Sequence, residues 1–285
     1  MLADLNTAAT FTSMSTGENA VWLAGEQTIP FRASASGATE ISGLSGSLYG
    51  STTAAALYRE ILTADSAQYF ERAHASVVQR AIDAQAALNG AMVDAAALEA
   101  VPTAPSGGTN GLAAQLNTVA RIIGARSALG LRRQVFFVGL GGFDTHDAQL
   151  NRHAALLGTL GQGLAYFQRL LADPAIGAAG SVTTFTASDF GRTMVSNGDG
   201  TDHGWGSHHF VVGQAVRGGD IYGRFPVIGA DTADDVGRGR LLPGQSVDQF
   251  AATLAGWFGV STSLIDDLFP NLVNFGSARD LGFML

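Results

Sequence analysis

The chain has 285 residues, of which 46% are hydrophobic, and this is enough to bury the core of one large domain. Its formal net charge of −8 at pH 7 leaves no basic stripe to meet phosphates, which argues against a nucleic-acid partner. All 16 residues counted as lysine or arginine are arginine, and cysteine is absent. The composition therefore excludes a lysine Schiff base, a Walker lysine, disulfides, thiolate nucleophiles and cysteine-ligated metals.

Residues 1–50 are rich in Gly, Ser, Thr and Ala, which predicts irregular chain with short strands at Ala20–Gly25 and Thr28–Arg32. No apolar run reaches the roughly 18 residues of a membrane span. The stretch Met1–Asn19 lacks the basic start and the apolar segment of a signal peptide.

Residues 51–130 are expected to form a helical cover. Apolar side chains recur at helical spacing over Ser51–Leu98, and a break near Thr63–Ser66 predicts two helices there. The linker Pro102–Asn110 precedes an amphipathic helix over Gly111–Ala128.

Residues 131–285 are expected to hold an α/β core with the functional site, within one domain that spans 1–285. The almost wholly apolar run Gln134–Leu140 predicts a strand of a parallel sheet. A helix over Asp147–Leu171 and a strand over Val182–Thr186 follow, and together they predict a βαβ unit. Because ligands of such sheets bind beyond the carboxyl ends of the strands, the residues that follow these two strands are the first candidates for chemistry.

The last third of the chain predicts further strands at His208–Val216 and Phe225–Ile228. An amphipathic helix is expected over Val247–Phe258, with Ser246 as its N-cap and Gly259 as its end. A short helix near Ser261–Leu268 completes the predicted elements.

Aspartate and histidine cluster after the predicted strands and in a glycine-rich loop, where five of the six histidines lie between His146 and His209. Carboxylate and neutral imidazole together form a divalent-metal site, with zinc as the first choice and manganese, magnesium or calcium as alternatives. The candidate ligands are Asp144, His146, Asp189, Asp202, His203 and His208. Arg192 is the candidate catalytic residue, because its guanidinium can fork onto the oxygens of an ester substrate.

Other roles remain open for several of these residues. Asp144 and Asp189 can each cap a helix instead of binding a metal. His208 and His209 lie in a strand-like run and must point to opposite faces, so at most one of them is a ligand, and His208 is favoured.

A serine hydrolase could use Ser188 or Ser207, but the chain has no Gly-x-Ser-x-Gly elbow. It also lacks a dinucleotide-binding Gly-x-Gly-x-x-Gly turn.

Ordered motifs in this region resemble the DUF1501 family. The resemblance covers the chain from about Leu2 to its end, and is densest from Phe136 onward. It is carried by Gly142–His146, Thr186–Thr193, Gly200–Gly206, Gly218–Gly223, Gly239–Pro243, Ala252–Gly259 and Phe269–Leu272.

This resemblance implies a place in the alkaline phosphatase/sulfatase-like superfamily. The fold expected from it is α/β, with a mostly parallel central sheet flanked by helices. The expected function is metal-dependent hydrolysis of phosphate or sulfate esters, with a small-molecule or glycan ester as the substrate. Family members typically carry a twin-arginine export signal, which implies a periplasmic or secreted protein.

The chain departs from the superfamily pattern in two places. Phe190 stands where the superfamily often has histidine, so Asp189 alone carries over, and His203 is expected to supply the imidazole. A segment before Met1, with the first core strand, a metal-binding aspartate and the Ser/Thr nucleophile, is expected from the family. We therefore expect an N-terminally truncated fold with the metal half of a site, and an open sheet edge that a second copy or a partner chain would cover.

Two other functions fit the same sequence. One is a non-catalytic metal- or glycan-binding exported or surface protein, which keeps the pocket without turnover. The other is a structural α/β domain whose histidines are ordinary core or loop residues.

Overall fold

The computed structural model describes residues 6–7, 9–17, 21–25, 28–34, 37–44 and 46–285. The chain divides into two compact units: Met1–Leu140 with Gly158–Ala178, and Gly141–Leu157 with Ala179–Leu285. The helix α4 (Gln149–Ala172) begins in the second unit and ends in the first. The expected organisation as one domain stays a prediction. Within the described ranges, no helix has both the length and the apolar character needed to cross a bilayer.

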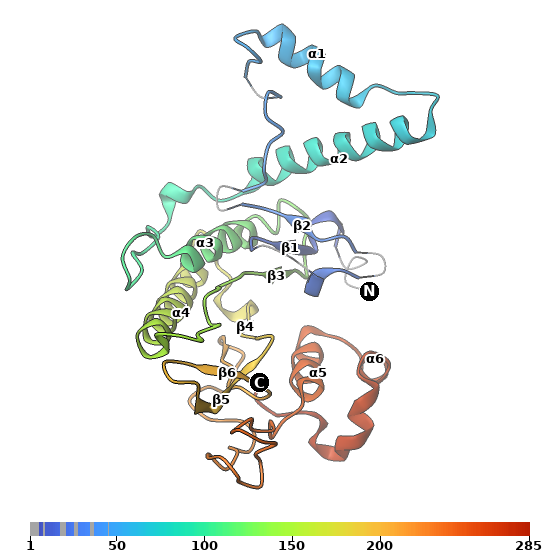
Figure 1. Ribbon diagram of the computed structural model, residues 1–285. Helices are drawn as coiled ribbons and strands as arrows, with labels where there is room; N and C mark the ends of the chain where they lie inside the picture. Colours follow the sequence, from blue (N-terminus) through green and yellow to red (C-terminus); the bar gives the residue numbers. More distant parts are fainter. Residues whose placement is uncertain (1–5, 8, 18–20, 26–27, 35–36, 45) are drawn as a thin grey trace. The chain divides into compact units, whose positions relative to one another are not determined.

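The first unit contains a small parallel sheet (Figure 1). Its strands, in spatial order, are β2 (Phe31–Arg32), β1 (Ser13–Ser15) and β3 (Val135–Phe137). Met14 in the central strand is fully buried and lies in one apolar cluster with Leu88 and Ile122. A parallel sheet with a strand in the run Gln134–Leu140 was predicted from the sequence, and both are confirmed. The sheet is far smaller than the superfamily resemblance implies, and an alkaline-phosphatase-like fold remains a proposal.

Three helices of the first unit follow the predicted helical cover. They are α1 (Thr52–Thr63), α2 (Tyr69–Ala91) and α3 (Gly111–Gly124). The Ser51 side chain accepts a hydrogen bond from the Ala54 N–H and begins α1. The break near Thr63–Ser66 is confirmed, and α1 packs along α2. Leu88 of α2 and Ile122 of α3 enter the cluster around Met14, so both helices cover the small sheet.

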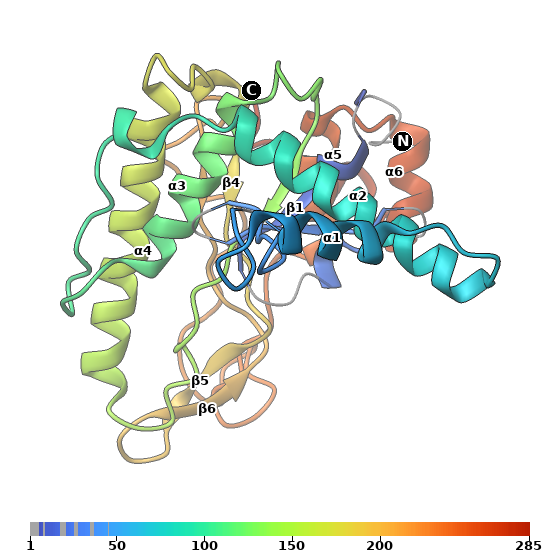
Figure 2. The ribbon, with the colours of Figure 1, turned by 90° about the horizontal axis from the view of Figure 1, so that it is seen from above.

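The helix α3 lies beside the last turns of α4 (Figures 1 and 2). Asn110 is fully buried, caps α3 at the Ala113 N–H, and donates to the carbonyl of Thr159 in α4 at 3.0 Å. Asn117 donates to the hydroxyl of the buried Tyr166 at 2.8 Å. These buried amides fix the pairing of the two helices, because an unmade hydrogen bond there would carry a desolvation cost.

The second unit contains two small antiparallel pairs of strands. They are β4 (Thr184–Phe185) with β7 (Val211–Val212), and β5 (Gly191–Ser196) with β6 (Thr201–Gly204). The predicted βαβ unit is therefore wrong, since β4 belongs to a different sheet from β3 and pairs antiparallel. The apolar pattern identified both segments as strands, but a two-residue strand says nothing of its partner.

Two other predicted strands are also wrong. Val21–Leu23 forms a short 3₁₀ helix, while Ala20 lies outside the described residues. Phe225–Ile228 forms no strand, because the Val227 N–H bonds to the Asp234 carboxylate at 2.7 Å instead of to a neighbouring strand. The strand β1 was not predicted, since its sequence Ser-Met-Ser offers a single apolar residue.

The C-terminal helices agree with prediction. The helix α5 (Val247–Phe258) begins with a capping box in which Ser246 and Gln249 bond each other's backbone N–H groups, and it ends at Gly259 with φ +98°. The helix α6 (Thr262–Leu268) follows, and the residues Pro270–Arg279 continue as 3₁₀ turns.

Candidate metal centre

The site lies wholly in the second unit, where the loop 141–148 meets the hairpin of β5 and β6. The loop supplies Asp144 and His146. The hairpin places Arg192 directly opposite His203, because these two residues are register partners. The sequence predicted Thr201–Gly204 as glycine-rich loop, so the hairpin is a correction, and it is the element that fixes the direction of the His203 side chain.

The hairpin turn is closed by Asn197. Its backbone N–H donates to the Gly200 carbonyl at 3.0 Å, and its side-chain oxygen accepts from the Gly200 N–H at 2.9 Å. The Ser196 hydroxyl donates to the same carbonyl at 3.0 Å. Gly198 takes φ +123° within the turn, a conformation that favours glycine.

The loop and the hairpin turn approach each other through glycine. The Asn197 side chain donates to the His146 carbonyl at 3.2 Å. Gly200 lies so close that a Cβ atom there would collide with the backbone of Thr145 and His146. The absence of a side chain at Gly200 therefore allows the loop to bring His146 beside β6.

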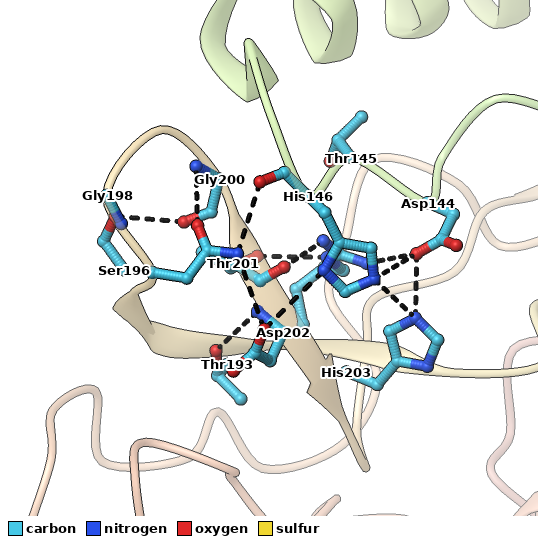
Figure 3. Close-up of polar contacts among 12 residues, drawn as sticks. Asp144, Thr145, His146, Thr193, Ser196, Gly198, Gly200, Thr201, Asp202 and His203 are labelled. Carbon is cyan, nitrogen blue, oxygen red and sulfur yellow. Dashed lines mark hydrogen bonds and ion pairs between the residues drawn. The ribbon is translucent and has the colours of Figure 1, made fainter.

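Three side chains converge on one point (Figure 3). The Asp144 Oδ1 atom lies 2.9 Å from His146 Nε2 and 2.8 Å from His203 Nε2, and the two Nε2 atoms are 3.3 Å apart. Within the described part of the chain, these three form the one group of three or more His, Cys, Asp or Glu residues whose ligand atoms all lie within 4.8 Å of one another. We call Asp144, His146 and His203 the triad.

The triad fits a divalent metal ion. Two ligand atoms about 2.0–2.1 Å from a tetrahedral zinc ion lie about 3.3 Å apart, which is the separation of the two imidazole nitrogens. The distances to Asp144 are shorter, as expected where a proton and not a cation joins the carboxylate to an imidazole. The three side chains are each about half exposed, so three ligands would leave a position open to solvent or substrate, as in catalytic metal sites.

Asp202 lies on the far side of the His146 ring. Its Oδ1 atom is 3.6 Å from His146 Nδ1, while its Oδ2 atom lies 3.1 Å from Arg238. A histidine that binds a metal through Nε2 carries its proton on Nδ1, and a carboxylate commonly holds that proton. Asp202 therefore faces the atom through which it can orient His146.

Arg192 and Phe190 complete the surroundings of the triad. The Arg192 NH1 group donates to Asp144 Oδ1 at 3.1 Å, and its Nε group donates to the Thr201 hydroxyl at 3.0 Å. The Phe190 ring stacks on the His203 ring, with centroids 3.9 Å apart and planes 4° apart. Neither Phe190 nor Arg238 was predicted as a site residue, because their roles depend on the hairpin.

The electrostatics keep Asp144 ionised. The hydrogen bond from His203 holds the pKa of the Asp144 carboxyl below its usual value, burial opposes this, and Arg192 and the charge of the two imidazoles add to the lowering. A carboxylate that is already ionised at neutral pH, beside two imidazoles, can bind a cation without first losing a proton.

Three predicted ligands lie outside the triad, namely Asp202, which faces His146 Nδ1, and Asp189 and His208. Asp189 is exposed and precedes β5, with no side-chain partner among the described residues. His208 packs against Phe225, with ring centroids 4.6 Å apart. His209 instead contacts Ser207 and Thr186. The strand β7 begins only at Val211, so the expectation that strand alternation points the two imidazoles to opposite faces stays a prediction.

No curated protein matches the chain, and no solved structure matches it. One protein family does match, over residues 30–261, a range that contains the triad, Arg192 and Asp202. The match spans most of the 285 residues, and the chain therefore belongs to the family described as "Protein of unknown function (DUF1501)".

Proposed function

We propose that the triad binds a divalent metal ion, with zinc as the first choice, and that it is the metal half of a phosphate or sulfate ester hydrolase site. The observation that carries this proposal is the convergence of Asp144 Oδ1 and two imidazole Nε2 atoms. Asp202 would hold the Nδ1 proton of His146, so we assign it an orienting role beside the ligands. We place the protein in the periplasm or outside the cell, on the family resemblance alone.

Each part of the site would have a separate task. A bound divalent ion supplies Lewis acidity toward an ester oxygen. The Arg192 side chain lies beside Asp144, is 19% exposed, and would contact another ester oxygen. Phe190 limits the movement of the His203 ring by stacking on it. The ester would be a small-molecule or glycan ester, as in the proposed superfamily.

A second function has one observation in its favour. The Arg192 guanidinium already bonds both the Thr201 side chain and its carbonyl, in addition to Asp144. An arginine so engaged can serve mainly to tie the loop to the hairpin. In that case the protein binds a metal ion or a glycan without turnover.

Metal binding is tested on the full chain, stripped with a chelator and titrated by calorimetry with zinc, manganese, magnesium and calcium. We expect one equivalent of metal, and a loss of affinity of at least about 100-fold in Asp144→Ala and in His203→Ala, since each removes a ligand atom. Asp189→Ala and His208→Ala are matched controls that should bind normally. Unchanged binding by Asp144→Ala would overturn the site.

Turnover separates the two functions. The metal-loaded chain is assayed with an aryl phosphate and an aryl sulfate, beside the Asp144→Ala variant. Hydrolysis that requires Asp144 supports the hydrolase. Stoichiometric metal binding without hydrolysis of either ester would instead support the non-catalytic protein.

A further inference from the structure

A second group of reactive side chains lies just beyond β6. The Ser207 hydroxyl oxygen is 3.0 Å from His209 Nε2, and the Thr186 hydroxyl oxygen is 3.3 Å from His209 Nδ1. The imidazole thus bridges two hydroxyl groups, one on each ring nitrogen. The triad uses none of these three residues, and nothing in the proposed metal chemistry requires them.

The hydrogen-bond pattern allows the proton arrangement that activates a serine. The Thr186 hydroxyl oxygen accepts a hydrogen bond from the Phe210 N–H at 2.9 Å and has a second lone pair. A proton on His209 Nδ1 can use that lone pair, which leaves Nε2 to accept the Ser207 proton. Nucleophile, base and a third group that orients the base are the parts of an activated serine.

The backbone on either side of Ser207 is fixed. The Gly206 N–H donates to the Leu241 carbonyl at 3.2 Å, and the Thr186 N–H donates to the Phe210 carbonyl at 3.0 Å. In the described part of the chain, the N–H groups of His208 and His209 make no hydrogen bond. These two donors are next to Ser207 in the chain and are candidates to bond a developing oxyanion.

One aromatic ring lies beside the base, and a second ring packs against the first. The Phe250 ring lies 6.4 Å from the His209 ring and 5.8 Å from the Phe185 ring, centroid to centroid. Phe185 and Phe210 are each about half exposed. A ligand held at Ser207 would therefore meet an apolar, ring-lined surface, which suits an aryl or alkyl carboxylic ester better than a charged one.

We propose that Ser207 is a nucleophile activated by His209, and that it forms a covalent acyl-enzyme with apolar carboxylic esters. The Ser207 Oγ atom bonds to the ester carbonyl carbon while its proton moves to His209 Nε2. The carbon–oxygen bond to the leaving alcohol then breaks, and His209 gives its proton to that alcohol. Water repeats the sequence at the acyl carbon, which releases the carboxylic acid and restores Ser207. This activity is independent of the metal ion.

The test is covalent labelling of the full chain by phenylmethanesulfonyl fluoride in the presence of EDTA. The serine oxygen displaces fluoride from sulfur, and His209 takes the serine proton. Because the chain lacks cysteine and lysine, their side chains cannot compete for the reagent. Trypsin cleaves after Arg192 and Arg217, and fragmentation of that peptide separates Ser207 from Ser196.

We expect one adduct per chain, on Ser207, and none in Ser207→Ala. His209→Gln should label at least about tenfold more slowly, because the base is lost. Ser188 donates to a carbonyl and has no imidazole partner, so Ser188→Ala should label normally. The labelling rate should be the same with and without EDTA, which separates this proposal from the metal site. An adduct elsewhere, no adduct in the unaltered chain, or equal rates in His209→Gln would overturn the proposal.

Discussion

The two compact units are stabilised in different ways. The first unit buries large side chains completely, among them Met14, Leu88 and Tyr166. Among the described residues of the second unit, only Leu272 and Thr145 belong to the same class of large, fully buried side chains. The second unit is instead ordered by polar contacts, as between Asn197 and Gly200, and by glycines that lie against other backbone segments.

This difference separates two ways of positioning a side chain. Apolar burial is not directional, so it fixes an element as a whole and tolerates conservative change. Hydrogen bonds and close backbone contacts are directional, so they fix single atoms, as a ligand site requires. We infer that the second unit buries fewer large side chains and uses directional contacts to hold an exposed triad in a defined orientation.

The largest expected effect tests the core of the first unit. Leu88→Ala removes a fully buried side chain from the cluster around Met14, and should lower the free energy of unfolding by about 2–5 kcal/mol. Urea denaturation measures this loss. The matched control is Leu57→Ala on α1, where the side chain is 54% exposed and the change should stay within about 0.5 kcal/mol. Metal affinity should not change in either variant, and a large loss in Leu88→Ala would contradict the separation of roles.

The next effect tests close backbone contact in the second unit. Gly200→Ala places a methyl group against the backbone of Thr145 and His146, and should cost about 1–3 kcal/mol of stability. Because the loop must retreat, metal affinity should also fall at least tenfold. Gly218→Ala is the matched control, since a Cβ atom there would meet open space. Equal metal affinity in the Gly200 and Gly218 variants would show that the hairpin contact does not position His146.

Local signals made most helices predictable from the sequence. Ser246 and Gly259 carry the cap chemistry of α5 in the sequence itself, and the structure confirms both ends. The hairpin of β5 and β6 was missed because its strands contain residues such as Arg192, Asp202 and His203, which show no apolar alternation. Polar strands of this kind are set by their partners, which a single segment does not reveal.

The candidate site was predictable in composition but not in arrangement. Asp144, His146 and His203 were chosen because Asp and His cluster at strand ends and in a glycine-rich loop, and the structure brings them together. Asp189 was chosen by the same reasoning, but β4 ends at Phe185 and leaves Asp189 apart from the triad. Side-chain direction depends on the register between Arg192 and His203, and residue spacing along the chain does not contain it.

A pH-dependent effect should come from a second polar contact of the same unit. Arg224 donates to both carboxylate oxygens of Asp234 at 2.7 Å. These bonds are the main cause that lowers the pKa of Asp234 from its ordinary 3.8 to about 2, and the bond from the Val227 N–H is a second cause. Because the folded-state pKa is the lower one, the carboxylate stabilises the fold fully above about pH 4. That contribution disappears as the pH falls through 2.

The comparison of wild type with Asp234→Asn isolates this contribution. Denaturant midpoints are measured at pH 7, 4 and 2.5. The variant should be less stable at pH 7, and its midpoint should fall less than that of the wild type between pH 4 and 2.5. Parallel curves for the two proteins would contradict the assigned role of Asp234.

The smallest effect, and the one most specific to the site, concerns Arg238. Its side chain is 60% exposed and its partner Asp202 is 36% exposed, so Arg238→Ala should change stability by only about 0.2–1 kcal/mol. The affinity of this variant for the metal ion should rise by a few-fold. Without Arg238, Asp202 accepts the Nδ1 proton of His146 more strongly, and one positive charge near the cation is gone.

Arg152→Ala, which breaks an exposed ion pair with Asp147, is the control and should leave affinity unchanged. Calorimetry at low salt and at 1 M salt measures the metal affinity of both variants. The higher affinity of Arg238→Ala should vanish at 1 M salt, where charges are screened beyond about 3 Å. A weaker metal site in Arg238→Ala would instead mean that Arg238 holds Asp202 in place, and that orientation outweighs charge at this edge of the triad.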